Sequence, residues 1–463
     1  MPVPKARRPN GIADRLARLD DLMSKVEDAP REWFLAAGMP TAGLGGSSVE
    51  SLPCEEFAVC EAAWKEAMRW RPDMGDAMAV LLAVCASTNQ AGNQLFLDLI
   101  GSPGGAKTTL CRGLLVSNHC IHLENVTKLI SGFKKKGDDN ADCSFLARAN
   151  NKTWVTCEFD VLANSTAYHE LMSKMRRIYD GETTATYGNN NVDRVYKALR
   201  TPWIRAGTQK MMDHDQAQLG DRFIRYILDE PPPLERREIA LAALRAERAA
   251  IVETANCTSI SLLDPKTRKA YALTGGYVDW LRTNVEEKIG QVAGNITPEV
   301  EQFCVDLADL SADLRARPQL HARKKDEGSE SHEYKELPTR LARQNLRLVC
   351  CLAVALNKQT VDARVMKILR KVALNTSAGH SLSMLEWLSS PNPKANDMRL
   401  QDSGGLTDSH LLSWVTMTPE KLGRYLTFLR KMDVLDWRVT NHTGGWYMTP
   451  RAEELWWRVQ RPL

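Results

Sequence analysis

The sequence predicts an α/β fold built on a parallel sheet. Four apolar runs with the character of buried strands lie at 93–101, 153–159, 201–207 and 222–228. Helical segments separate the first run from the second and the second from the third, and this alternation is typical of a parallel sheet covered by helices. A glycine-rich turn follows the first run and leads directly into a helix, and residues 235–310 are rich in Ala, Leu and Glu and predicted to be largely helical.

Composition and charge restrict the class of protein. The chain has 463 residues, of which 43% are hydrophobic and 25% charged, and its formal net charge is +4. These values are typical of a globular protein of several domains, and any nucleic-acid surface must be a local basic patch. No apolar run reaches the ~18 residues of a membrane-spanning helix, and the basic N-terminus lacks the apolar core of a signal peptide.

Cysteine usage indicates a reducing compartment. The 11 cysteines include no CxxC pair, and their odd number argues against a disulfide framework. His119, Cys120 and His122 are close in sequence, but no second pair follows at zinc-ligand spacing, so we expect ordinary core or surface roles for them. A cytoplasmic protein without a membrane partner fits these features.

Five segments are expected along the chain. An N-terminal helical and linker segment, the sheet-containing core, a helical region with an insertion, a second linker and a small C-terminal module should occupy 1–54, 55–232, 233–388, 389–405 and 406–463. The first boundary follows a Gly/Ser/Pro-rich stretch, and the second linker is rich in Ser, Pro, Asn and Asp.

The stretch DLIGSPGGAKTTLC, residues 98–111, predicts a phosphate-binding loop. Backbone N–H groups of such a turn converge on phosphate oxygens, and the next helix adds the positive end of its dipole. The spacing assigns Lys107 to the β- and γ-phosphates and Thr108 to magnesium, whereas the alternative is a glycine-rich turn without a ligand. Ala106 stands where glycine is usual, and its small methyl group can fit there if the local φ is negative. The expected nucleotide-binding residues are Gly101, Gly104, Gly105, Ala106, Lys107, Thr108 and Thr109.

Polar residues end the second and third strands. Glu158 is placed to orient an attacking water, and Cys157 occupies the preceding position, where an aspartate usually supports magnesium. Asp160 is the candidate to take part of that role, so the expected metal ligands are Thr108 and Asp160. A strand-end carboxylate without a catalytic duty is the alternative for Glu158. Thr208 and Gln209 would reach the γ-phosphate or the water.

Arg222 comes just before the fourth strand. Taken alone, an arginine there would be expected in a surface or salt-bridge role. Its position after the loop, the acidic strand end and the polar strand end instead favours contact with phosphate bound by a neighbouring subunit.

Five stretches, in this order, resemble the AAA+ core of the minichromosome maintenance (MCM) replicative helicases. They are GSPGGAKT, VTCEFDVL, TAYHELMSK, LGDRFIRYILDEPPPLERREIA and LPTRLARQNLRLVCCLAVAL. In that family, too, alanine precedes the loop lysine. The resemblance covers roughly residues 65–376 and is poor across 245–330. It implies an α/β AAA+ P-loop ATPase with a parallel sheet, a helical lid and a C-terminal winged helix-turn-helix.

The resemblance also implies ligands and roles for the loop and the strand ends. ATP would be the nucleotide and Mg²⁺ the cofactor, with Lys107 and Thr108 as their contacts. Glu158 would be the catalytic base or the acid that positions the water. Thr208 or Gln209 would be the first sensor, where the family prefers asparagine.

Two further arginines carry over from the family. Arg222 corresponds to the arginine finger, which acts on the site of a neighbouring subunit. Arg340 corresponds to the second sensor, and Arg343 is the competing choice. Together these residues imply a homo-oligomeric ring with ATP between subunits, expected to be a hexamer.

DNA-binding segments are implied in the same way, because the family reads DNA with two pore hairpins. One corresponds to 182–199, where Arg194 and Lys197 follow the GNNN tip. The other falls within 130–141, where an aromatic residue precedes three lysines and suits backbone contact with base stacking. A solvated lysine run is the alternative there. The lysines are Lys134, Lys135 and Lys136.

The C-terminal module is predicted to be a winged helix-turn-helix. Thr407 and Thr418 are expected to cap two helices, with Pro419 in the first turn of the second. A hairpin around a Gly-Gly turn would form the wing. Lys421 and Arg424 are left for solvent or DNA, although winged helices also mediate protein contacts.

The function expected from these features is that of an ATP-driven DNA helicase or translocase acting in replication on single-stranded or forked DNA. The short region before the core indicates a shortened relative, as a mobile element would carry, with a primase among the possible partners. One alternative is an AAA+ initiator or remodeller that hydrolyses ATP without processive unwinding. A third is a scaffold that binds ATP without turnover, which Cys157 favours.

Overall fold

The computed structural model describes most of the chain from residue 49 onward. The described ranges are 49–90, 92–123, 128–133, 142–164, 168–187, 192–214, 222–254, 264–316, 337–389, 405–415, 417–440 and 443–461. Expected features outside them are the N-terminal segment up to residue 48, most of the second linker, and Lys134, Lys135 and Lys136.

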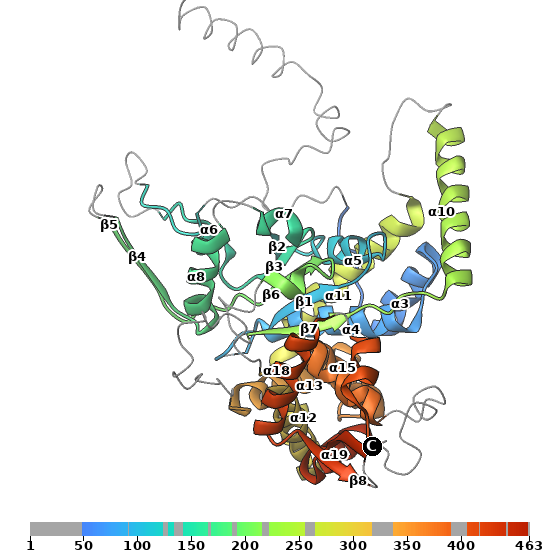
Figure 1. Ribbon diagram of the computed structural model, residues 1–463. Helices are drawn as coiled ribbons and strands as arrows, with labels where there is room; N and C mark the ends of the chain where they lie inside the picture. The colour runs from blue at the N-terminus through green and yellow to red at the C-terminus, as the bar shows by residue number, and fades with distance from the viewer. Residues whose placement is uncertain are drawn as a thin grey trace, which may run out of the picture.

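A five-stranded parallel sheet forms the centre of the molecule, as the sequence predicted (Figure 1). Its strand order is β2-β3-β6-β1-β7. The four apolar runs are strands, and the strand missed in sequence is β2, which is only three residues long and so too short to show a pattern. The strands are β1 (Phe96–Ile100), β2 (Cys120–His122), β3 (Thr153–Thr156), β6 (Trp203–Gly207) and β7 (Phe223–Ile227).

The two faces of the sheet pack into separate cores because side chains alternate along each strand. Phe96 and Ile100 join the core on one face, and Leu97 and Leu99 join the core on the other. The first core includes α8 (Tyr168–Tyr179) together with two short helices, α6 (Phe145–Ala149) and α7 (Phe159–Ala163). The second includes α3 (Phe57–Ala67), α4 (Pro72–Ser87) and α5 (Lys107–Leu114).

A buried ion pair crosses the middle of the sheet. Arg205 on β6 donates to both carboxylate oxygens of Asp98 on β1, over 2.7 and 2.9 Å, and both side chains are excluded from solvent. The guanidinium lies 3.4 Å from the centre of the Phe223 ring and 4.3 Å from that of Phe159. Two opposite charges with bidentate geometry and aromatic rings around them can be buried together, whereas burial of either charge alone would be costly.

An antiparallel hairpin projects from one side of the core. It consists of β4 (Thr183–Tyr187) and β5 (Val192–Tyr196), with Thr183 opposite Tyr196. Figure 1 shows it at the end of the molecule away from α10. The structure therefore confirms two extended segments around the GNNN stretch.

Within the described ranges, the chain between β7 and residue 389 is largely helical. The two apolar helices predicted within 339–376 are confirmed as α13, which packs on α4, and α14, which packs on β7. No helix in the described ranges is long and apolar enough to cross a membrane. The helices are α10 (Pro233–Thr254), α11 (Pro265–Gly294), α12 (Pro298–Arg315), α13 (Thr339–Ala355), α14 (Ala363–Thr376) and α15 (His380–Ser389).

The C-terminal residues form two helices, a hairpin and a last helix. Thr407 accepts a hydrogen bond from the His410 amide, and Thr418 accepts one from the Lys421 amide, so both predicted caps are confirmed. The elements are α17 (Asp408–Trp414), α18 (Pro419–Lys431), β8 (Leu435–Thr440), β9 (Thr443–Met448) and α19 (Pro450–Gln460).

Charged pairs hold these C-terminal residues against α12. Arg451 on α19 bonds to Asp313 over 2.8 Å, and Arg458 pairs with Asp306 at 3.4 Å. Both aspartate side chains are buried, so the pairs are more than surface contacts. The C-terminal elements are thus docked on the helical region.

Candidate nucleotide-binding site

Residues that follow four strands meet at one edge of the sheet. The predicted ones are the glycine-rich loop after β1, Glu158 and Asp160 after β3, and Thr208 after β6. Glu230, which the sequence did not single out, follows β7. All these strands run in the same direction, so their carboxyl ends share that edge. In open α/β sheets this is the edge at which ligands bind.

The loop closes tightly before α5. The Gly105 amide donates to the Ser102 carbonyl over 3.0 Å, and Gly104 has a φ of +75°. Ala106 has a φ of +66° and caps the N-terminus of α5. The negative φ under which the Ala106 methyl would fit freely is therefore not adopted: the turn needs the left-handed conformation there, which costs a residue with a Cβ about 1–2 kcal/mol.

Lys107 is held against the loop. Its ammonium donates to the carbonyls of Gly101 and Ser102 over 2.8 and 2.7 Å. Burial lowers the pKa of Lys107, and the nearby Asp160 carboxylate opposes that shift. A buried cation beside a row of backbone amides is suited to an anionic ligand.

Thr108 and Thr208 connect the loop to the neighbouring strand ends. The Thr108 hydroxyl donates to the Cys157 carbonyl over 3.4 Å, and the Thr208 hydroxyl donates to an Asp160 carboxylate oxygen over 3.2 Å. Of the two sensor candidates, Thr208 is therefore bonded within the site, whereas Gln209 is exposed.

The acidic strand end presents its side chains in two directions. Glu158 is exposed at the N-terminus of α7, and Asp160 is half-buried in the first turn of that helix. The Cys157 side chain is only 5% exposed and belongs to the core on the α5 face of the sheet. The Thr108 hydroxyl therefore bonds to the backbone carbonyl of Cys157 and not to its side chain.

The oxygen atoms at these strand ends fit a magnesium ion that takes most of its ligands from phosphate groups and water. Such an ion takes one or two protein oxygens, which the Thr108 hydroxyl and the Asp160 carboxylate can supply. Within the described ranges no group of three His, Cys, Asp or Glu side chains could hold a metal ion without such help.

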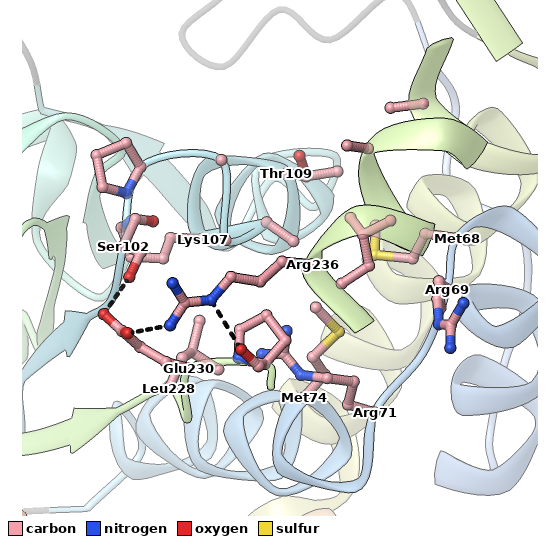
Figure 2. A pocket seen from close by; sticks show the side chains of 18 of the residues that line it. Met68, Arg69, Arg71, Met74, Ser102, Lys107, Thr109, Leu228, Glu230 and Arg236 are labelled. Carbon is pink, nitrogen blue, oxygen red and sulfur yellow. Dashed lines mark hydrogen bonds and ion pairs between the residues drawn. The ribbon is translucent and has the colours of Figure 1, made fainter. Parts of the chain in front are cut away.

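A pocket of about 670 Å³ opens beside the loop, within the size range of small-molecule sites. Figure 2 shows the loop and Lys107 on one side, with Met68, Met74 and Arg236 around the rest. The sequence assigned no role to these wall residues: Met68 and Met74 belong to no motif, and Arg236 stands in the stretch LGDRFIRYILDEPPPLERREIA only as one charge of a helix. Besides loop residues 102–109, the lining consists of Ala67, Met68, Arg69, Arg71, Met74, Leu228, Asp229, Glu230, Pro231, Arg236, Ile239, Ala240, Ala242 and Ala243.

Arg222 lies at the opposite edge of the sheet from the loop. It immediately precedes β7, which runs parallel to β1 with Phe223 opposite Phe96. The loop begins only after the end of β1, so a five-residue strand of about 16 Å separates Arg222 from it. An arginine side chain cannot span that distance within one subunit.

Arg222 and Arg340 share the surroundings of Tyr179. The Arg222 guanidinium lies 5.4 Å from the centre of the Tyr179 ring and 3.6 Å from Asp180. Burial raises the pKa of Tyr179 to about 12, and the charges of Arg340 and Arg222 counteract that rise. Gln344 donates to the Tyr179 hydroxyl and to the Arg222 carbonyl, each over 2.9 Å. The structure thus brings the two arginines together, away from their own loop.

The predicted DNA-binding residues are placed differently from one another. Arg194 pairs with Asp142 at 3.8 Å and its side chain is 14% exposed, so it ties the hairpin to the neighbouring segment. Lys197 is exposed at the end of the hairpin, Arg424 is exposed on α18, and Lys421 is half-buried.

Comparisons with known proteins add no family to this description. The sequence matches no model of a known protein family. A comparison with curated proteins also finds no significant match. The interpretation of the site therefore depends on its geometry and on the motifs in the sequence.

Proposed function

We propose that the protein is an ATPase of the AAA+ class. The observation that carries the proposal is the convergence of Lys107, Thr108, Asp160 and Thr208 at one sheet edge, beside a pocket of nucleotide size. The motif order resembling the MCM family supports the same class. A glycine-rich turn without a ligand would not require a strained alanine and a buried lysine.

Each of these residues has a separate role in the proposed reaction. The loop amides and Lys107 bind the phosphates, and Thr108 with Asp160 would hold Mg²⁺, which would neutralise charge on the transferred phosphate. Glu158, exposed at the start of α7, orients the attacking water. Thr208 fixes the Asp160 carboxylate through its hydroxyl.

Arg222 and Arg340 are proposed to complete the site of a neighbouring subunit. The strand that separates Arg222 from its own loop supports action in trans, and Arg340 shares the surroundings of Tyr179 with it. Head-to-tail contacts that close generate a ring. We propose a homo-oligomeric ring, and a hexamer as its size.

The outer face of α10 supports this assembly. Leu234 and Leu241 are 82% and 45% exposed, and their seven-residue spacing places them on one face of α10, away from Arg236 and the other residues that line the pocket. Leu244, which is 65% exposed, borders this face. Exposed leucines on one face mark a surface that another protein covers. We propose that the next subunit covers it.

DNA is the proposed partner of the ring, and translocation or unwinding during replication its proposed activity. The hairpin β4–β5 projects from the core, and α18 carries exposed Arg424, Arg430 and Lys431 next to the hairpin β8–β9. This arrangement of helices and hairpin supports the winged-helix interpretation. The alternative, an initiator or remodeller without processive unwinding, is favoured by Arg194, which is tied to Asp142.

Two assays test the proposal. DNA-stimulated ATP hydrolysis that disappears in Lys107→Ala is expected, and hydrolysis that is absent or insensitive to this change would contradict an ATPase. A forked duplex with either tail polarity then divides the alternatives: unwinding supports the helicase, and ATPase without unwinding supports the initiator or remodeller.

A further inference from the structure

Glu230 places a carboxylate against the phosphate loop. The Ser102 hydroxyl donates to one of its oxygens over 2.9 Å, and Arg236 donates to the other over 2.7 Å (Figure 2). Arg236 also donates to the Pro231 carbonyl over 2.8 Å. A negative group therefore bonds to the turn where an anion is expected to bind.

A phosphate chain would compete with Glu230 for these donors. Like charges repel over the few ångströms concerned, and both a hydroxyl and a guanidinium can bond to phosphate as well as to carboxylate. The Arg236 and Glu230 side chains are 56% and 52% exposed. An ion pair that exposed contributes little to stability, so its exchange costs little.

Arg236 is positioned by a helix that faces the site. It lies in the first turns of α10, on the side that also presents Ile239 and Ala243 to the pocket. Arg69 holds this part of α10 to the end of α3 through Glu235 and Glu238. The α10 backbone thus lies across the pocket from the loop, and the Arg236 side chain reaches from this supported helix to Glu230 on the loop side (Figure 2).

We infer that Arg236 binds phosphate in the site of its own subunit, and that Glu230 competes with the nucleotide for it. Binding of a nucleoside triphosphate moves Arg236 from the carboxylate to a phosphate oxygen and frees Ser102 from Glu230. The inference rests on the proposed function, since it requires a nucleotide on this loop.

Two substitutions should act in opposite directions on nucleotide affinity. Arg236→Ala is expected to weaken ATP binding about 10-fold, because it removes a charged hydrogen bond. Glu230→Gln is expected to tighten binding several-fold, because it removes the competing charge. Equilibrium binding of ATP and of inorganic triphosphate, measured by calorimetry, would show both effects with both ligands if Arg236 touches phosphate.

The control is Arg237→Ala, which removes an exposed neighbouring arginine that does not line the pocket and should leave affinity unchanged. If Arg236 and Glu230 formed only a structural ion pair, the two substitutions would both weaken ATP binding or would both leave it unchanged. Either result overturns the inference. If the wild-type protein binds ATP through Lys107 but the two substitutions do not change the affinity as expected, only the inference is overturned. If wild-type protein binds no ATP, the proposed function and the inference fall together.

Discussion

The Thr208 hydroxyl donates to the Asp160 carboxylate over 3.2 Å and so joins the end of β6 to the first turn of α7. Asp160 also lies near Lys107, whose pKa it raises against the effect of burial. One carboxylate therefore connects the loop lysine with the strand end that the sequence marked as a sensor.

Thr208→Val should lower kcat for ATP hydrolysis by about 10- to 100-fold, as expected for loss of a bond that orients a ligand-bearing carboxylate. Nucleotide affinity should change less, because the loop and Lys107 are intact. Gln209→Ala is the matched control and should leave kcat near wild type, since its side chain is exposed. Equal effects of the two substitutions would remove Thr208 from the site.

Ala106→Gly should stabilise the protein by about 1 kcal/mol, because glycine adopts the left-handed conformation without steric cost. The midpoint of denaturant unfolding measures it. Ala106→Val should destabilise the protein and weaken ATP binding, since a branched side chain resists that conformation. A loss of stability in Ala106→Gly would contradict the turn geometry described above.

Cys157→Asp should destabilise the protein by about 3 kcal/mol or more, because it buries a carboxylate in an apolar core. An aspartate at this position, which the MCM helicases have, is therefore not expected to improve hydrolysis. Cys157→Ala is the control and should retain ATPase activity, since Thr108 bonds to the backbone carbonyl. A stable, more active Cys157→Asp protein would show that this side chain faces the magnesium.

Arg424→Ala should weaken binding to duplex and single-stranded DNA regardless of sequence, and should reduce the slope of log K against log salt by about 1. Arg458→Ala serves as the control, because that arginine lies on α19 rather than α18 and pairs with Asp306 on α12. Fluorescence anisotropy at several salt concentrations measures both. An unchanged slope in Arg424→Ala would exclude α18 from the DNA path.

Local patterns in the sequence predicted the elements that local chemistry determines. The glycine-rich loop, four of the five strands, α13, α14 and the Thr407 and Thr418 caps depend on residues close in the chain. The positive φ of Ala106 could not be foreseen from the local pattern, because the side chain favours negative φ, whereas closure of the turn requires the opposite.

Features that depend on distant segments could not be predicted in this way. Asp98 and Arg205 are single charges within apolar strands, and only the pairing of β1 with β6 makes them partners. Met68 precedes the first strand of the sheet in the sequence and Arg236 follows β7, yet both line the pocket. The ion pair of Arg194 with Asp142 likewise depends on how the hairpin folds back.

The central claim is that each ATP site is shared between subunits. Glu158→Gln and Arg222→Ala proteins should each lose hydrolysis, the latter by ~10³-fold or more. Mixed in equal amounts and allowed to exchange subunits, they should recover part of the wild-type DNA-stimulated rate, because some interfaces combine an intact Glu158 with an intact Arg222. A mixture that stays as inactive as its components, although mass measurement shows mixed rings, would contradict the account.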